Sequence, residues 1–184
     1  MADTQWPRYM VFQGHEPGDD LVHNGTVHAP DAEMALLTAR DVFSRRPRAV
    51  SMWVVPADEI FSITHEELQN EKLQIANGDN DSKSQEAYHV FGKTYEQGQC
   101  EQFGEVDAVS HEDAMKKAIE TFKHKKALWW WAFPARAVLS STDSDTDSMF
   151  APVLDKHYRD QAQFPVMTMM RAVRAKRKGE VKDG

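Results

Sequence analysis

Apolar positions along the chain fall into one order of elements that occurs twice. Short runs that alternate between apolar and polar residues predict strands, and apolar residues at helical spacing predict one helix between them. The strands are predicted at 8–13, 22–29 and 50–55 in the first copy and at 87–92, 101–108 and 128–133 in the second. Glycines between the first two strands of each copy favour hairpins. The pattern therefore predicts a ββαβ unit written twice.

The two copies align residue by residue. Tyr9–Phe12 falls on Tyr88–Phe91 and Gly25–Ala29 on Gly104–Ala108, each 79 positions apart, and one deleted residue then places Trp53–Ala57 on Trp131–Ala135. Ordered blocks at a fixed separation indicate an internal duplication. We expect a first module, a linker with a short helix, a second module, and an acidic linker followed by a basic tail. Their ranges are 1–62, 63–86, 87–140 and 141–184.

Capping residues indicate where the helices begin. Asp31 and Ser110 occupy the same aligned position, and both residue types are good N-caps. Thr64 with Glu67 forms a capping-box pattern, which predicts the short linker helix. The apolar helix faces predicted to be buried are Ala35, Leu36, Ala39, Val42 and Phe43 in the first copy and Ala114, Met115, Ala118 and Phe122 in the second.

The third strand of each copy is apolar on both faces. Val50, Met52 and Val54 alternate with Trp53 and Val55, and the aligned strand contains Leu128 and Trp129-Trp130-Trp131. Because one helix covers only one face of a small sheet, either the other copy or a partner protein covers the second face. The sequence thus predicts an α+β fold in which two tandem ββαβ modules pack as a pseudo-dimer.

Aromatic and arginine side chains are the usual anchors of protein interfaces. The candidates for partner docking are Trp53, Trp129, Trp130, Trp131, Arg45, Arg46 and Arg48. Each group has two possible roles. The tryptophans either form a docking surface or lie in the core between the copies. The arginines either bind an acidic patch or complement the dipole at the end of a helix.

Composition narrows the function classes. The 184 residues carry a net charge of −7, which argues against nucleic acid as the main partner. No apolar run has the length of a membrane span, and the first residues do not resemble a signal peptide, so we expect a cytoplasmic protein without a membrane partner. A single cysteine, Cys100, excludes an internal disulfide and a cysteine-rich metal site, and we expect it to be structural.

Catalytic motifs are missing from the sequence. It contains no glycine-rich nucleotide fingerprint, nucleophile elbow or HExxH pair. His15, His23 and His28 lie close together on the first predicted hairpin. They are either the ligands of a metal site or ordinary surface histidines. The aspartates at 143, 145 and 147 imitate a calcium loop but lack its glycine and its bidentate glutamate. We therefore predict no catalytic, cofactor-binding or metal-binding residues; the alternative is a small-molecule or metal site between the modules.

The first copy resembles a known family. The matching segments are Trp6–Phe12, Val22–Ala29, Met34–Leu36, Ala39–Asp41, Arg45–Arg46 and Val50–Val55. This ordered series is similar to the phenylacetic acid degradation B family, the small subunits of the bacterial ring-1,2-phenylacetyl-CoA epoxidase complex. The second copy resembles it more weakly, through Gly104, Ala114, Phe122 and Trp131.

The resemblance implies a role in a multicomponent oxygenase. It implies that a different subunit carries the di-iron centre, that a reductase supplies electrons, and that the small subunit has no assigned catalytic residue. The expected function is a non-catalytic accessory subunit of a phenylacetyl-CoA oxygenase in aerobic phenylacetate degradation, with the di-iron subunit and the reductase as partners. Self-association into a homo-oligomer is compatible with this function. The chain departs from the family by carrying two modules where members typically have one.

Overall fold

The computed structural model describes residues 6–44, 49–70, 84–142, 148–150 and 169–171. The elements in chain order are β1 (Arg8–Gly14), β2 (Val22–His28), α1 (Ala32–Phe43), β3 (Ser51–Pro56), η1 (Ala57–Glu59), β4 (Phe61–Thr64), α2 (His65–Asn70), β5 (Glu86–Lys93), β6 (Glu101–Ala108), α3 (His111–Thr121), η2 (Lys123–Lys125), β7 (Trp129–Pro134), η3 (Ala135–Ala137) and β8 (Leu139–Ser140). All six predicted strands are confirmed, and so is the short linker helix, which is α2.

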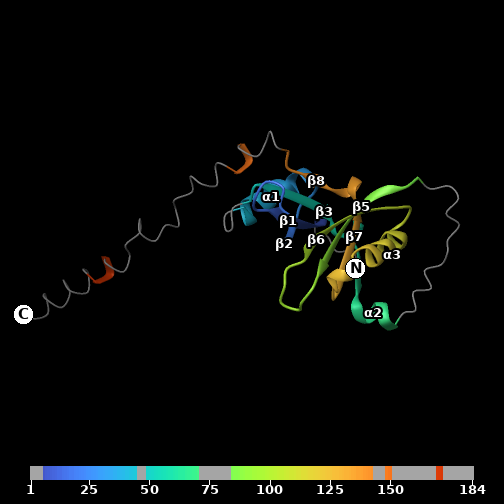
Figure 1. Ribbon diagram of the computed structural model, residues 1–184. Coiled ribbons are helices and arrows are strands. Elements are labelled where there is room, and N and C mark those ends of the chain that lie inside the picture. Colours follow the sequence, from blue (N-terminus) through green and yellow to red (C-terminus); the bar gives the residue numbers. More distant parts are fainter. Residues whose placement is uncertain (1–5, 45–48, 71–83, 143–147, 151–168, 172–184) are drawn as a thin grey trace, which may run out of the picture.

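The strands form one antiparallel sheet with the order β4-β7-β5-β6-β2-β1-β3-β8. Figure 1 shows α1 beside the strands of the first copy and α3 beside those of the second. The predicted α+β class is confirmed. Two strands cross between the copies: β4 follows β3 in the chain but pairs with β7, and β8 follows β7 but pairs with β3.

The helices begin where the capping residues predicted. Asp31 Oδ1 accepts a hydrogen bond from the Met34 backbone N–H at 2.8 Å, and Ser110 Oγ accepts one from the Asp113 N–H at 3.2 Å. Thr64 and Glu67 bond reciprocally ahead of α2, because each side chain accepts the other residue's backbone N–H. These bonds satisfy amide groups that have no partner within a first helical turn.

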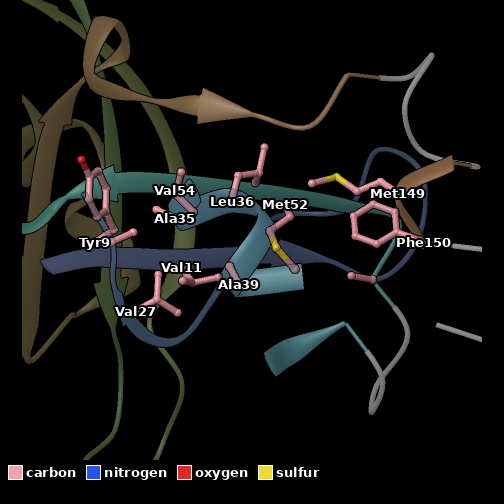
Figure 2. Packing of buried hydrophobic residues seen from close by; sticks show 12 residues of the cluster. Tyr9, Val11, Val27, Ala35, Leu36, Ala39, Met52, Val54, Met149 and Phe150 are labelled. Carbon is pink, nitrogen blue, oxygen red and sulfur yellow. The ribbon is translucent and has the colours of Figure 1, made fainter. Parts of the chain in front are cut away.

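Each helix covers one face of its own copy's strands. Alternate residues of β1 and β3, such as Val11, Met52 and Val54, pack against Ala35 and Ala39 of α1 and are fully buried. The members of this first helix-side core are Tyr9, Val11, Val27, Ala29, Ala35, Leu36, Ala39, Ala49, Met52, Val54, Met149 and Phe150 (Figure 2). The second helix-side core packs Tyr88, Val90, Trp130 and Ala132 against α3 in the same way.

One helix-face prediction is wrong. Val42 lies in the last turn of α1 and is 59% exposed instead of buried. Phe43 makes the contact with the sheet instead, and its ring lies so close to Gly25 that a Cβ at that glycine would meet the ring at 2.8 Å. Phe122 and Gly104 repeat this contact at the aligned positions of the second copy.

The helix-free faces of the two copies meet in one shared cluster. Phe12, Leu21 and Val55 come from the first copy, and Phe91 and Phe133 come from the second. β1 and β5 are separated by β2 and β6, which would place them about 14 Å apart in a flat sheet. The ring centroids of Phe12 and Phe91 are nevertheless only 4.5 Å apart. The sheet therefore bends sharply between β2 and β6 and folds its helix-free face onto itself.

The predicted burial of both faces of the third strand fails at the start of β7. Leu128 is 40% exposed and Trp129 is 44% exposed. Trp129 lies opposite Thr64 on one side and Lys93 on the other, at the ends of β4 and β5. Both residues therefore lie at the margin of the sheet.

Candidate functional site

The three consecutive tryptophans have three different environments because strand side chains alternate between faces. Trp130 is 4% exposed and packs in the second helix-side core, with its ring 5.5 Å from Phe103. Trp131 is half-buried in the shared cluster, where its ring lies 4.9 Å from His23. Trp129 is the exposed member of the run. Among these three residues, Trp129 thus presents the largest apolar surface to a partner.

Trp53 is the residue of the first copy that aligns with Trp131. It also contacts a histidine across the shared cluster. Its ring centroid is 4.6 Å from that of His89. Trp131 and Trp53 therefore each contact a histidine of the opposite copy. The three arginines at 45, 46 and 48 that were predicted to assist docking lie outside the described residues.

Both histidines are largely withdrawn from solvent, His89 as a buried residue and His23 as a half-buried one. Burial lowers the pKa of His23, although a backbone hydrogen bond at Gly25 opposes the shift. Burial also lowers the pKa of His89, against the pull of Glu105, whose Oε1 lies 3.2 Å from Nδ1. From the sequence, His23 is predicted to be a metal ligand or a surface histidine, and His89 is not placed in this cluster. The apolar alternation of its strand was the available signal, because it places His89 on the same face as Phe91.

Metal chemistry finds no support in the part of the chain that the structure describes. That part contains no group of three or more histidine, cysteine or acidic side chains placed to hold a metal ion. The Asp143, Asp145 and Asp147 segment lies outside it. Burial raises the pKa of the Cys100 thiol to about 12, which agrees with a structural role because only the thiolate is a good nucleophile.

A polar cavity of about 550 Å³ lies at the start of α3. Arg136 beside it donates to Glu86 at 3.1 Å and to Glu59 at 3.3 Å, so its charge is neutralised by two carboxylates. The Tyr88 hydroxyl donates to the same Glu86 at 3.1 Å, and burial raises the pKa of Tyr88 to about 12. These groups hold one another in one network of hydrogen bonds beside the cavity.

An apolar cavity of about 340 Å³ lies at the other end of α3, beside the exposed start of β7. Its lining residues are His65, Ile119, Lys123, Lys126, Ala127, Leu128 and Trp130. The described lining of both cavities comes from the second copy and from the linker that precedes it. Neither cavity provides the site between the two copies that the alternative prediction requires.

None of the helices within the described ranges combines the length and the apolar character needed to cross a lipid bilayer. This finding concerns only the segments that the structure places.

Comparison with known proteins agrees with the resemblance found in the sequence. The profile of the family described as phenylacetic acid degradation B matches residues 5–80 and again residues 84–171. The B-type subunit of the 1,2-phenylacetyl-CoA epoxidase of Escherichia coli (strain K12) is 43% identical over 67 residues, which cover 36% of this chain and 70% of that protein. No solved structure shows significant similarity to the chain. Because the family profile matches most of the chain in two successive segments, this protein belongs to the phenylacetic acid degradation B family.

Proposed function

We propose that this chain is a non-catalytic accessory subunit of a multicomponent phenylacetyl-CoA oxygenase that acts in aerobic phenylacetate degradation. The observation that carries the proposal is the family match over both copies, together with the 43% identity to a relative whose name makes it one subunit of an epoxidase. In this proposal oxygen is activated at a di-iron centre in a partner subunit, and a reductase supplies the electrons.

We further propose that residues 1–62 and 87–140 are two modules packed as a pseudo-dimer, joined by the linker at 63–86 and followed by the tail at 141–184. The pairing of the strands supports this arrangement. Where β2 meets β6, His23 N–H donates to Cys100 O at 2.8 Å and Gln102 N–H donates to Leu21 O at 2.9 Å. Each partner of one bond is 79 positions from its counterpart in the other, as a two-fold axis between the copies requires.

The crossing strands obey the same two-fold relation, at the separation of 78 positions that follows the deleted residue. Phe61 of β4 pairs with Ala132 in the second copy, and Leu139 of β8 pairs with Val54 in the first. Each copy thus adds one edge strand to the strands of the other copy. Two separate single-module chains would have to associate from solution to form this sheet. Fusion makes the same association intramolecular, which raises the effective concentration of each module for the other.

We propose that the exposed margin around Trp129 contributes to the docking of the partner, with Arg45, Arg46 and Arg48 as additional candidates. Trp130 is a core residue in the structure, and Trp53 and Trp131 are half-buried in the shared cluster. Trp129 is thus the tryptophan of the run best placed to be buried by a partner. An exposed large aromatic residue is the kind of side chain that dominates binding energy at interfaces.

The proposal is tested by purifying the tagged full-length chain from its own host grown on phenylacetate and identifying co-purified proteins by mass spectrometry. We expect the di-iron oxygenase subunit and its reductase. The Trp129→Ala variant should recover less of both, whereas Val42→Ala, which alters a similarly exposed apolar residue on α1, should recover as much as the wild type. If neither component is recovered from a lysate that contains both, the accessory function is wrong.

A further inference from the structure

The two helix-side cores end differently. In the first, Met149 is 8% exposed and Phe150 is 2% exposed, and both pack into the core although they lie beyond β8 in the chain. Figure 2 shows them together at one end of the cluster beside Met52. A pair of adjacent bulky apolar side chains therefore closes the first core from outside the ββαβ unit.

Among the described residues, the second core leaves an apolar groove at the matching place. Ala127 and Trp130 align with Ala49 and Met52 of the first core, and both line the apolar cavity of about 340 Å³. Ile119 and the 40% exposed Leu128 form the rest of its apolar lining. No residue that the structure describes packs over this groove as Met149 and Phe150 pack over the first core.

The groove is edged with basic groups. Lys123, Lys126 and His65 line it, and none of the described lining residues is acidic. The segment that closes the first core has the opposite character, since aspartates at 143, 145 and 147 precede Met149 and Phe150. An acidic segment that ends in two apolar side chains would match both the lining and the charge of the second groove.

We propose that this groove binds a segment of a partner protein in which acidic residues precede two adjacent bulky apolar side chains. This inference rests on the proposed accessory function, because the partner is then a component of the same complex. The apolar pair fills the space over Ala127 and Trp130, and the acidic residues face Lys123 and Lys126. Segments of the chain itself fit less well. The linker separates Leu73 from Ile75 by a glutamine, and the apolar residues of the tail are followed by Arg171 and Arg174.

The first test uses a fluorescein-labelled peptide with the sequence of residues 142–150, titrated with the full-length chain and read by fluorescence anisotropy. We expect saturable binding that weakens as salt is added. The double variant Lys123→Glu/Lys126→Glu should bind about ten-fold more weakly or worse, because two attractive charges become repulsive. Arg8→Glu is the charge control: it alters an exposed cation outside the groove lining and should bind like the wild type.

Two further results would overturn the proposal. Equal binding by the wild type and the Lys123→Glu/Lys126→Glu variant would mean that the peptide binds elsewhere, for example by displacing Met149 and Phe150 from the first core. Binding that appears only after Leu73→Ser/Ile75→Ser would mean that the chain's own linker fills the groove. A peptide in which both apolar residues are serine should not bind, which checks that the apolar pair is required.

The second test separates this inference from the accessory function. The purification from phenylacetate-grown host is repeated with Ile119→Asp, which places a charge in the groove lining, and with the lysine variant in case the aspartate impairs folding. Recovery of the oxygenase components by the wild type but not by these folded variants supports the groove. Equal recovery by all would refute the groove and leave the accessory function standing. If the wild type recovers no oxygenase component while the peptide binds, the accessory function is wrong. The groove then still binds an acidic segment with two apolar side chains, but its partner belongs to another complex.

Discussion

The shared cluster provides a direct test of how the two copies are held together. Phe12 is fully buried, and its ring lies 4.5 Å from Phe91, 5.4 Å from Phe133 and 5.5 Å from His23. Phe91 is the residue aligned with Phe12 in the second copy, so two equivalent rings pack on each other. Phe12→Ala removes the central ring of this cluster and leaves a cavity that residues from both copies line.

The expected loss is large. Truncation of a buried phenylalanine to alanine typically lowers the free energy of unfolding by about 3–5 kcal/mol, because burial is lost and the cavity collapses only in part. Contacts between aromatic rings contribute about 0.5–1.5 kcal/mol beyond burial. We expect about 4 kcal/mol for Phe12→Ala. With a urea m-value of about 2 kcal/mol per molar, the unfolding midpoint falls by about 2 M.

The assay is equilibrium unfolding in urea, followed by tryptophan fluorescence and by circular dichroism. Val42→Ala is the control, because this small side chain is 59% exposed and its truncation should change stability by less than about 0.5 kcal/mol. The double variant Phe12→Ala/Phe91→Ala should show a coupling of about 1–2 kcal/mol, since the two rings are in contact. A loss at Phe12 no larger than that of the control, or additive losses in the double variant, would refute a core shared by the two copies.

Three further predictions concern stability. Burial lowers the pKa of His23 and His89 in the folded protein, so the unfolded chain takes up protons at a higher pH than the folded chain does. The free energy of unfolding should therefore fall as the pH drops below about 6.5. Urea unfolding at about pH 8 and about pH 5 measures this fall. Gly104→Ala should cost about 1–3 kcal/mol, because φ is +147° and the new Cβ would meet Phe122 at 2.8 Å; thermal unfolding measures it. Ser110→Ala should cost about 1 kcal/mol in the same measurement, because the cap of α3 is lost.

The aligned copies supply the controls for these predictions. His23→Gln and His89→Met introduce the residues found at the aligned positions of the other copy. The double variant should lose most of the dependence of stability on pH. If the dependence is unchanged, other titrating groups cause it. Gly25→Ala should cost about as much as Gly104→Ala, since its φ is +149° and Phe43 lies at the same 2.8 Å. Ser110→Asp should retain the cap, and a loss equal to that of alanine would contradict the capping argument.

The candidate site was only partly predictable from the sequence. The tryptophan run was visible, but alternation along β7 assigns Trp129, Trp130 and Trp131 to three environments, and only the packing of neighbouring elements decides which one stays exposed. The apolar groove had no sequence signal. It lies where residues of α2, α3 and β7 meet, and it is recognised as open only because Met149 and Phe150 close the corresponding place in the first copy.

The sequence by itself determined much of the local structure: the repeat, the positions of β1–β3 and β5–β7, the capping residues and the short linker helix, but not β4 or β8. These features depend on hydrogen bonds and side-chain periodicity within a few residues, so neighbouring residues specify them. Only the tertiary structure decided that β4 and β8 cross between the copies and that the sheet bends at β2 and β6. Those choices depend on contacts between residues far apart in the chain. Phe12 and Phe91, for example, lie on strands separated by two others in the sheet, and burial of their rings is what favours the bend.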